Sequence, residues 1–242
     1  KNNAKNSKVG ITLNLNTAIP ASDSEHDKKA CDFYDAQFNR LYLEPLYNQK
    51  YPELLFECLL QKNLIKQTDL TFIKNDDLKT IATKTDFLGV NYYSRGVIRS
   101  DEVDEEINDK PNVDLGPKTD FGWEVYPQGI YDLLKKLHVD YNVQDIIVTE
   151  NGCSYSDGPN ENKKINDTKR IEYHKSHVEQ IQIAINDGIP CTGYFAWSLM
   201  DNFEWAEGYS QRFGLIWVDF ETLERIPKKS YYWYQNFIKS QK

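Results

Sequence analysis

The chain of 242 residues contains only four cysteines, four histidines and one methionine. Its cysteines stand far apart without a C-x-x-C pair, which argues against a disulfide framework and against a cysteine metal site. No apolar run approaches the length that spans a membrane, and no signal peptide is visible. We therefore expect no metal, no cofactor and no membrane contact. Unpaired thiols favour the cytoplasm, whereas a single glycosylation sequon at Asn166 leaves secretion open.

Positive charge is also scarce, because 37 acidic residues outnumber 29 basic ones and give a net charge of −8. This balance argues against a nucleic-acid partner and against an anionic membrane surface. Aromatic residues are plentiful, with 16 tyrosines and five tryptophans. Aromatic rings stack on the C–H faces of sugars and carboxylates hold sugar hydroxyls, so this composition suits a carbohydrate ligand.

Short β-branched or apolar segments alternate with segments of helical period, which predicts an α/β fold with a parallel sheet. The predicted strands are Val9–Asn14, Phe87–Tyr93, Gln144–Thr149 and Cys191–Trp197. The predicted helices are Lys28–Arg40, Leu41–Tyr51 with Pro45 and Pro52 as breakers, Leu54–Leu64, Leu78–Ala82 capped by Asn75–Asp77, Pro127–Val139, Asp167–Asn186 and Ser230–Ser240. Polar loops are expected over 100–119 and 154–166, and a hairpin within Phe203–Val218.

Polar and aromatic residues follow the end of each predicted strand, as in the active face of a βα barrel. They are Asn14, Asn16, Asn91, Tyr93, Glu150 and Trp197. An open doubly wound sheet is the competing fold, but the glycine-rich phosphate turn that usually follows its first strand is missing. Four βα units make half of an eight-fold barrel, with two unpaired edge strands. The chain has no initiator methionine and enters a strand almost at once, so we expect it to start inside a larger polypeptide.

Four motifs in combination resemble the C-terminal half of family 1 glycoside hydrolases, the β-glucosidase family. They are Thr149–Gly152 (T-E-N-G), Asn91–Tyr93 (N-Y-Y), Trp197–Trp205 (W-S-L-M-D-N-F-E-W) and Gly208–Asp219 (G-Y-S-Q-R-F-G-L-I-W-V-D). The resemblance implies that residues 1–242 are strands five to eight, with their helices, of a (β/α)8 TIM barrel. They would form the C-terminal half-barrel of a single glycosidase domain whose N-terminal half is not in this chain.

The resemblance also implies a role for individual residues. Glu150 would be the nucleophile of a retaining glycosidase, and Tyr93 would orient it through a hydroxyl hydrogen bond. Glu204 would hold the O4 and O6 hydroxyls of the sugar, because one carboxylate accepts two hydroxyl hydrogens. Trp197 would offer a flat face to the sugar ring and Trp205 an indole N–H.

Further substrate-binding residues implied by the resemblance are Asn91, Trp123 on the aglycone side, and Phe213. Members of the family that act on phospho-sugars typically carry serine at the position of Glu204, lysine at Gln211 and tyrosine at Phe213. Since none of those three residues is present, the sequence argues against a 6-phosphate substrate.

The acid/base glutamate of the family, in an N-E-P motif, is absent, and Leu43–Pro45 (L-E-P) lies in a predicted helix or turn. We therefore expect a β-glucosidase-type O-glycosidase that hydrolyses terminal β-D-glucosyl or β-D-galactosyl residues only with the N-terminal half as partner. A thioglucosidase with glutamine as the unseen acid/base residue and a non-catalytic binding module are the alternatives. His174 and His177 have the i, i+3 spacing of a metal pair, but we interpret them as ordinary surface or packing histidines.

Overall fold

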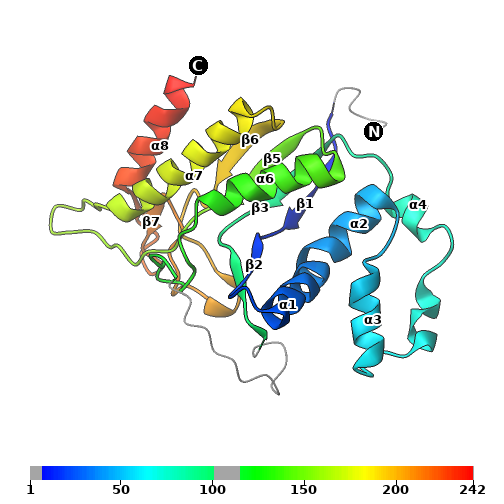
Figure 1. Cartoon of the computed structure of the whole chain (residues 1–242). Helices are drawn as coiled ribbons and strands as arrows, with labels where there is room; N and C mark the ends of the chain where they lie inside the picture. The colour runs from blue at the N-terminus through cyan, green and yellow to red at the C-terminus, as the bar shows by residue number, and fades with distance from the viewer. Residues whose placement is uncertain (1–6, 101–114, 242) are drawn as a thin grey trace.

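The computed structural model describes residues 7–100 and 115–241, and a parallel sheet lies at its centre (Figure 1). Its strands pair in the order β1-β3-β5-β6. They are β1 (Gly10–Asn14), β3 (Phe87–Asn91), β5 (Ile146–Asn151) and β6 (Cys191–Ala196). The four predicted strands and the α/β class are thus confirmed, with strand ends moved by one or two residues.

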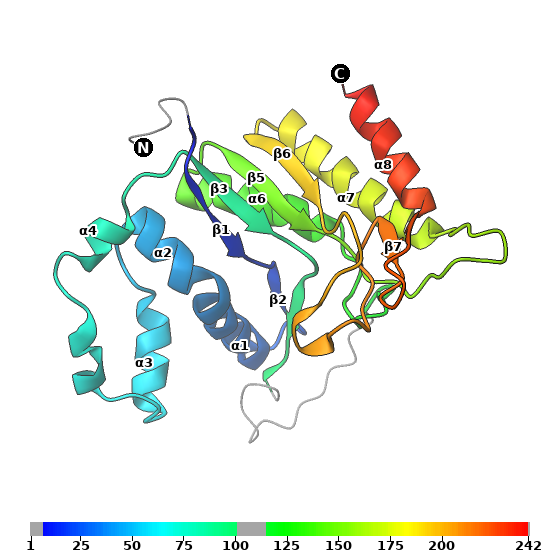
Figure 2. The same ribbon diagram turned by 180° about the vertical axis from the view of Figure 1, so that it is seen from behind.

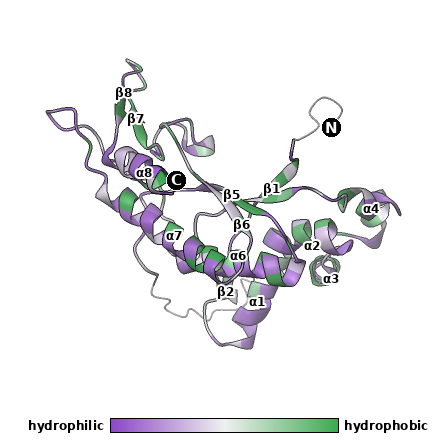
Figure 3. Ribbon diagram, turned by 90° about the horizontal axis from the view of Figure 1, so that it is seen from above, coloured by the Kyte–Doolittle hydropathy of each residue, from purple (hydrophilic) through white to green (hydrophobic). Residues whose placement is uncertain are grey.

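Helices connect the strands, and Figures 1, 2 and 3 show α2, α6 and α7 along one face of the sheet. The helical segments are α1 (Glu25–Asp35), the π turn η1 (Ala36–Arg40), α2 (Leu41–Asn48), α3 (Glu53–Gln61), the 3-10 turn η2 (Gln67–Phe72), α4 (Asp77–Ile81), α6 (Gln128–Tyr141), α7 (Thr168–Asn186), the 3-10 turn η3 (Trp205–Glu207) and α8 (Lys229–Ser240). Parallel strands with crossover helices on one face are the arrangement of part of a βα barrel.

The core lies between this sheet face and the helices. Leu88 and Val90 of β3 are fully buried, as are the i, i+2 pair Ile146 and Val148 of β5, since alternate strand residues share one face. They pack against a stripe on α6 made of Ile130, Leu133, Leu134 and Leu137. The outer strands are less covered: Ile11 of β1 is 37% exposed and Phe195 of β6 is 60% exposed.

Three helix predictions need correction. The first helix starts at Glu25 rather than Lys28, because the Ser24 hydroxyl accepts a hydrogen bond from the backbone N–H of Asp27 and caps the helix. Pro45 does not break α2, which continues past it to Asn48 and is preceded by the π turn η1. Asp76 precedes α4 without a side-chain cap bond.

Two further strand pairs were placed wrongly or missed. The hairpin pairs β7 (Ile216–Val218), which ends the predicted range, with β8 (Arg225–Pro227), which lies beyond it. Asp219 forms the turn, because its carboxylate accepts bonds from the N–H groups of Glu221 and Thr222. A short parallel pair, β2 (Ala18–Pro20) with β4 (Gly96–Ile98), was not predicted. Of the loop predicted over 100–119, residues 101–114 lie outside the described part of the chain.

Candidate active site

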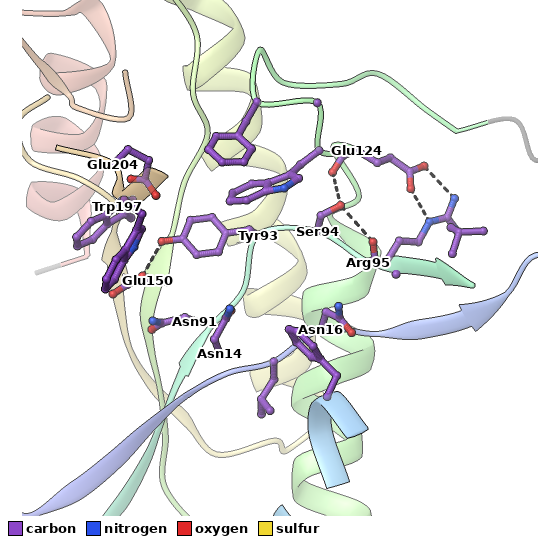
Figure 4. A pocket seen from close by; sticks show the side chains of 18 of the residues that line it. Asn14, Asn16, Asn91, Tyr93, Ser94, Arg95, Glu124, Glu150, Trp197 and Glu204 are labelled. Carbon is purple, nitrogen blue, oxygen red and sulfur yellow. Dashed lines mark hydrogen bonds and ion pairs between the residues drawn. The ribbon is translucent and has the colours of Figure 1, made fainter. Parts of the chain in front are cut away.

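A cavity of about 790 Å³ opens at the carboxyl ends of the four central strands (Figure 4). Each strand contributes to its wall, and the cavity brings together the strand-end residues that the sequence singled out. Its lining includes Asn14, Asn16, Asn91, Tyr93, Glu150 and Trp197. Parallel strands all end at one edge of a sheet, which is why residues so far apart in sequence meet there.

Glu150 lies at the end of β5, and the Tyr93 hydroxyl donates a hydrogen bond to its Oε2 at 2.6 Å (Figure 4). Burial, followed by this bond to the carboxylate, raises the pKa of Tyr93 well above its usual value. Tyr93 therefore stays protonated and remains a donor at any working pH. This short bond holds the carboxylate of Glu150 in one orientation at the end of β5.

Gly152 explains why the end of β5 can approach Trp197. A Cβ at position 152 would overlap the carbonyl oxygen of Trp197, so only glycine fits between the two segments. The backbone N–H of Trp197 donates to the carbonyl of Asn151 at 2.8 Å. Trp197 is thereby held beside Glu150 on the cavity wall.

Glu204 projects into the same cavity from the loop after β6. Partial burial raises the pKa of its carboxyl, the negative charge of Glu150 raises it further, and a hydrogen bond from Trp197 opposes the shift. Two carboxylates in one cavity disfavour an anionic ligand there, because like charges repel.

The loop that carries Glu204 is held by a buried ion cluster at Asp201. Its carboxylate accepts bonds from Arg212 at 2.8 Å, from Lys228 at 3.2 Å and from the backbone N–H of Gly214 at 2.9 Å. Asp201 and Lys228 are almost fully buried, and burial lowers the pKa of Lys228 to about 8. The cluster ties the loop to the segment before α8, so the position of Glu204 is fixed by residues outside the cavity.

The remaining predicted site residues divide into those the structure brings to the cavity and one that it does not. Asn91, Trp123 and Trp205 line the cavity, and the indole of Trp205 is 85% exposed. Thr149 donates to the Asn91 amide oxygen at 2.7 Å, which leaves the amide N–H groups for a ligand. Phe213 is not on the wall: it is 2% exposed and packs edge-on behind Tyr93, with ring centroids 6.2 Å apart.

Sequence reasoning missed the ion pair that positions the Trp123 loop. Arg95 holds Glu124 through two bonds of 2.6 and 2.9 Å, and its guanidinium lies 3.8 Å from the centre of the Tyr126 ring. Both partners line the cavity. Their 29-residue separation in sequence offered no local signal for the pairing.

His174 and His177 are buried in α7, as packing residues and not as surface residues. Burial lowers their pKa values to about 3 and about 4, so both are neutral. Within residues 7–100 and 115–241, no cluster of three or more His, Cys, Asp or Glu side chains is arranged to hold a metal ion. None of the helices in these residues has the length and apolar composition of a membrane span.

Comparison with known proteins agrees with this geometry. A 1,4-β-D-glucan glucohydrolase of Thermotoga neapolitana is 43% identical over 238 residues, which cover 98% of this chain and 52% of that protein. The solved structure of a β-glucosidase from Thermotoga maritima in complex with glucoimidazole is 42% identical and has a TM-score of 0.84, over 98% of this chain and 52% of that one. A β-glucosidase from Exiguobacterium marinum is 34% identical with a TM-score of 0.89, over 98% and 53%.

The chain thus spans about half the length of the relatives it matches, and its four βα units correspond to part of their TIM barrel. The sequence pattern that describes glycosyl hydrolase family 1 matches residues 1–242. On the strength of that match and of these relatives, the chain belongs to glycosyl hydrolase family 1.

Proposed function

We propose that this chain supplies the nucleophile and one wall of the sugar site of a retaining β-glycosidase that acts on terminal β-D-glucosides. The 2.6 Å bond from Tyr93 to Glu150, inside a strand-end cavity, is the observation that carries the proposal. A carboxylate that is held by a hydrogen bond and faces a cavity is suited to attack an anomeric carbon. The relative that holds glucoimidazole supports a glucose-like ligand.

In this mechanism the Glu150 carboxylate attacks the anomeric carbon, and the bond to the leaving-group oxygen breaks. A carboxylic acid protonates that oxygen, and the same group then deprotonates the water that hydrolyses the glycosyl-enzyme ester. Retaining glycosidases hold the two carboxyl groups about 5–5.5 Å apart. Each step of the reaction passes through an oxocarbenium-like transition state. We assign the proton donor to a complementary half-barrel, present in cis or as a separate chain.

The sugar hydroxyls are assigned to Glu204 and to the indole N–H of Trp205, the face of the sugar ring is assigned to Trp197, and Asn91 lies beside Glu150. A carboxylate at position 204 would repel a 6-phosphate. Gln211 takes no part in the cavity wall, because its side chain accepts a hydrogen bond from Ser154 at 2.7 Å. A neutral sugar therefore fits this site better than a phospho-sugar. Trp123 and Phe121 line the cavity where an aglycone would lie.

Mechanism-based labelling tests the proposal. A 2-fluoro glucosyl inhibitor, applied to the chain together with its complementary half, should label Glu150 and no other carboxylate of this chain. Glu150→Gln should abolish turnover of an aryl β-glucoside. Glu150→Gly should regain turnover when azide is added, with the α-glycosyl azide as product. A label on a different carboxylate would remove the assignment.

A further inference from the structure

A buried hydrogen-bond network lies beneath Glu150, and it starts at the neighbouring residue Asn151. The Asn151 side chain is fully buried, and its amide nitrogen donates to the carbonyl of Tyr92 at 2.8 Å and to the hydroxyl of Tyr173 at 3.1 Å. Its amide oxygen accepts from the Tyr194 hydroxyl at 2.9 Å. The Tyr173 hydroxyl in turn donates to the carbonyl of Tyr93 at 3.0 Å.

The geometry allows one arrangement of protons in this network. A backbone carbonyl can only accept, so the atom of Asn151 that faces Tyr92 must be the amide nitrogen. The amide oxygen then faces Tyr194, which must donate its only hydroxyl hydrogen to it. The oxygen of Tyr194 is left to accept from Nδ1 of His174, 2.9 Å away. The network is therefore fully determined and has no alternative set of bonds.

The single hydrogen of the Tyr173 hydroxyl is also assigned, because its oxygen accepts from Asn151 and its hydrogen points at the Tyr93 carbonyl. Tyr173 is 1% exposed on α7, and its ring stacks on His177 with centroids 4.0 Å apart. His177 donates from Nδ1 to the backbone carbonyl of Tyr173 at 2.7 Å. These contacts fix the Tyr173 side chain on α7, outside the cavity wall.

We propose that Tyr173 is a positioning residue: it joins the backbone of Tyr93 to the side chain of Asn151 and so sets the contact between Tyr93 and Glu150. Two segments meet here without a regular ladder, since the pairing of β3 with β5 shifts register between Val90 and Asn91. Beyond this shift the backbone N–H of Tyr92 donates to the carbonyl of Glu150 at 2.9 Å, and the side-chain bonds of Asn151 and Tyr173 add to that bond. The inference rests on the proposed role of Glu150 as nucleophile.

The effect of removing the Tyr173 hydroxyl follows from the same contacts. Without it, the Tyr93 carbonyl loses its donor and the strand end can move, which loosens the bond from Tyr93 to Glu150. Tyr93 and Glu204 are titratable groups that face Glu150, and its charge raises the pKa values of both. A weaker bond to the carboxylate stabilises the ionised form less, so the acid limb of the pH–rate profile should move to higher pH.

The test is Tyr173→Phe in the complete enzyme, with kcat and KM for an aryl β-glucoside measured across pH. We expect kcat to fall about 10–100-fold, the cost of a small misplacement of the reacting groups. We also expect little change in KM and an acid limb about 0.5–1 pH unit higher. Tyr92→Phe is the matched control, because the Tyr92 side chain is equally buried and its hydroxyl donates to the carbonyl of Tyr126 at 2.8 Å, away from Glu150.

An acid limb that stays in place in Tyr173→Phe, or that moves equally in Tyr92→Phe, would overturn the positioning role. If Tyr173→Phe does not fold, Tyr194→Phe replaces it, since that variant removes one of the bonds that hold Asn151 and should shift the acid limb in the same direction by less. No shift in Tyr194→Phe would then overturn the inference. A parent enzyme that does not hydrolyse glucosides and is not labelled at Glu150 would instead refute the proposed function.

Discussion

Glu150 and Glu204 share one cavity, yet their surroundings prepare them for different tasks. Glu150 accepts a short hydrogen bond from a tyrosine that cannot ionise at working pH, whereas the pKa of Glu204 is raised by partial burial and by the charge of Glu150. An ionised carboxylate is required for attack on carbon. The Glu204 carboxylate, which shares the cavity wall with Trp197 and Trp205, is suited to accept hydroxyl hydrogens. The division of roles is therefore set by the neighbours of each group rather than by residue type.

We predict that Glu204→Ser lowers kcat/KM for aryl glucosides. The loss should correspond to about 2–4 kcal/mol of transition-state stabilisation. Hydroxyl contacts tighten as the ring distorts, so the rate should suffer more than ground-state binding. Phenyl and dinitrophenyl glucosides should lose rate by the same factor. If Glu204 were instead the proton donor, the loss would fall mainly on the phenyl substrate, whose leaving group needs protonation.

The raised pKa of Glu204 also predicts a pH-dependent change in stability. The folded protein binds the proton of the Glu204 carboxyl more tightly than the unfolded chain does. This proton binding therefore stabilises the fold below about pH 4.5, and the stabilisation is lost as pH rises through the raised pKa of Glu204. Glu204→Gln should therefore raise the melting temperature at pH 7 by roughly 1–2 °C, after allowance for solvent screening. Calorimetry at pH 4 should show no such gain; an equal gain at both pH values would contradict the electrostatic origin.

At the scale of secondary-structure elements, Arg170 at the start of α7 joins the loops that frame the cavity. Its guanidinium is fully buried and pairs with Asp167 at 3.0 Å. Its other N–H groups donate to the backbone carbonyls of Cys153, Tyr155, Arg212 and Phe213. One side chain thus fastens the loop after β5 to the segment that follows Glu204. A planar guanidinium with five donors can do this, whereas an ammonium group cannot.

We predict that Arg170→Lys costs about 3 kcal/mol of unfolding free energy, because several buried carbonyls lose their donors while the charge remains. Urea denaturation of the complete enzyme measures this loss. Arg225→Lys serves as the control, since Arg225 is exposed and donates to the neighbouring carbonyl of Leu223, and it should stay within about 0.5 kcal/mol of the parent. Equal effects in the two variants would show that Arg170 is not a structural hub.

At the scale of the whole molecule, the sheet has two free edges within residues 7–100 and 115–241. Strands β1 and β6 each pair on one side only, and residues on or beside them expose apolar surface, with Val9 51% and Phe195 60% exposed. Unpaired, apolar parallel edges are sites of aggregation. The complementary half-barrel that we propose would pair with both edges and cover this surface.

We predict that residues 1–242 alone neither melt cooperatively nor hydrolyse an aryl β-glucoside, and that they aggregate or pair edge to edge. Adding the complementary half, in cis or in trans, should restore a sharp melting transition and turnover together, because the same strand pairing closes the core and supplies the proton donor. Thermal unfolding and turnover with and without that half provide the measurement. Full activity of the monomeric chain by itself would refute this view.

The sequence by itself determined the order of the four central strands and of the helices between them, because their apolar periods are local and strong. It also indicated the strand-end residues, since β-branched runs such as Ile146–Val148 lead straight into Glu150. Only the tertiary structure decided which distant groups meet. Phe213 lies behind Tyr93 instead of on the cavity wall, and Tyr173 comes from an outer helix to hold the strand end. Local periodicity fixes the element in which a residue lies, but its partners depend on how the elements pack across long sequence separations.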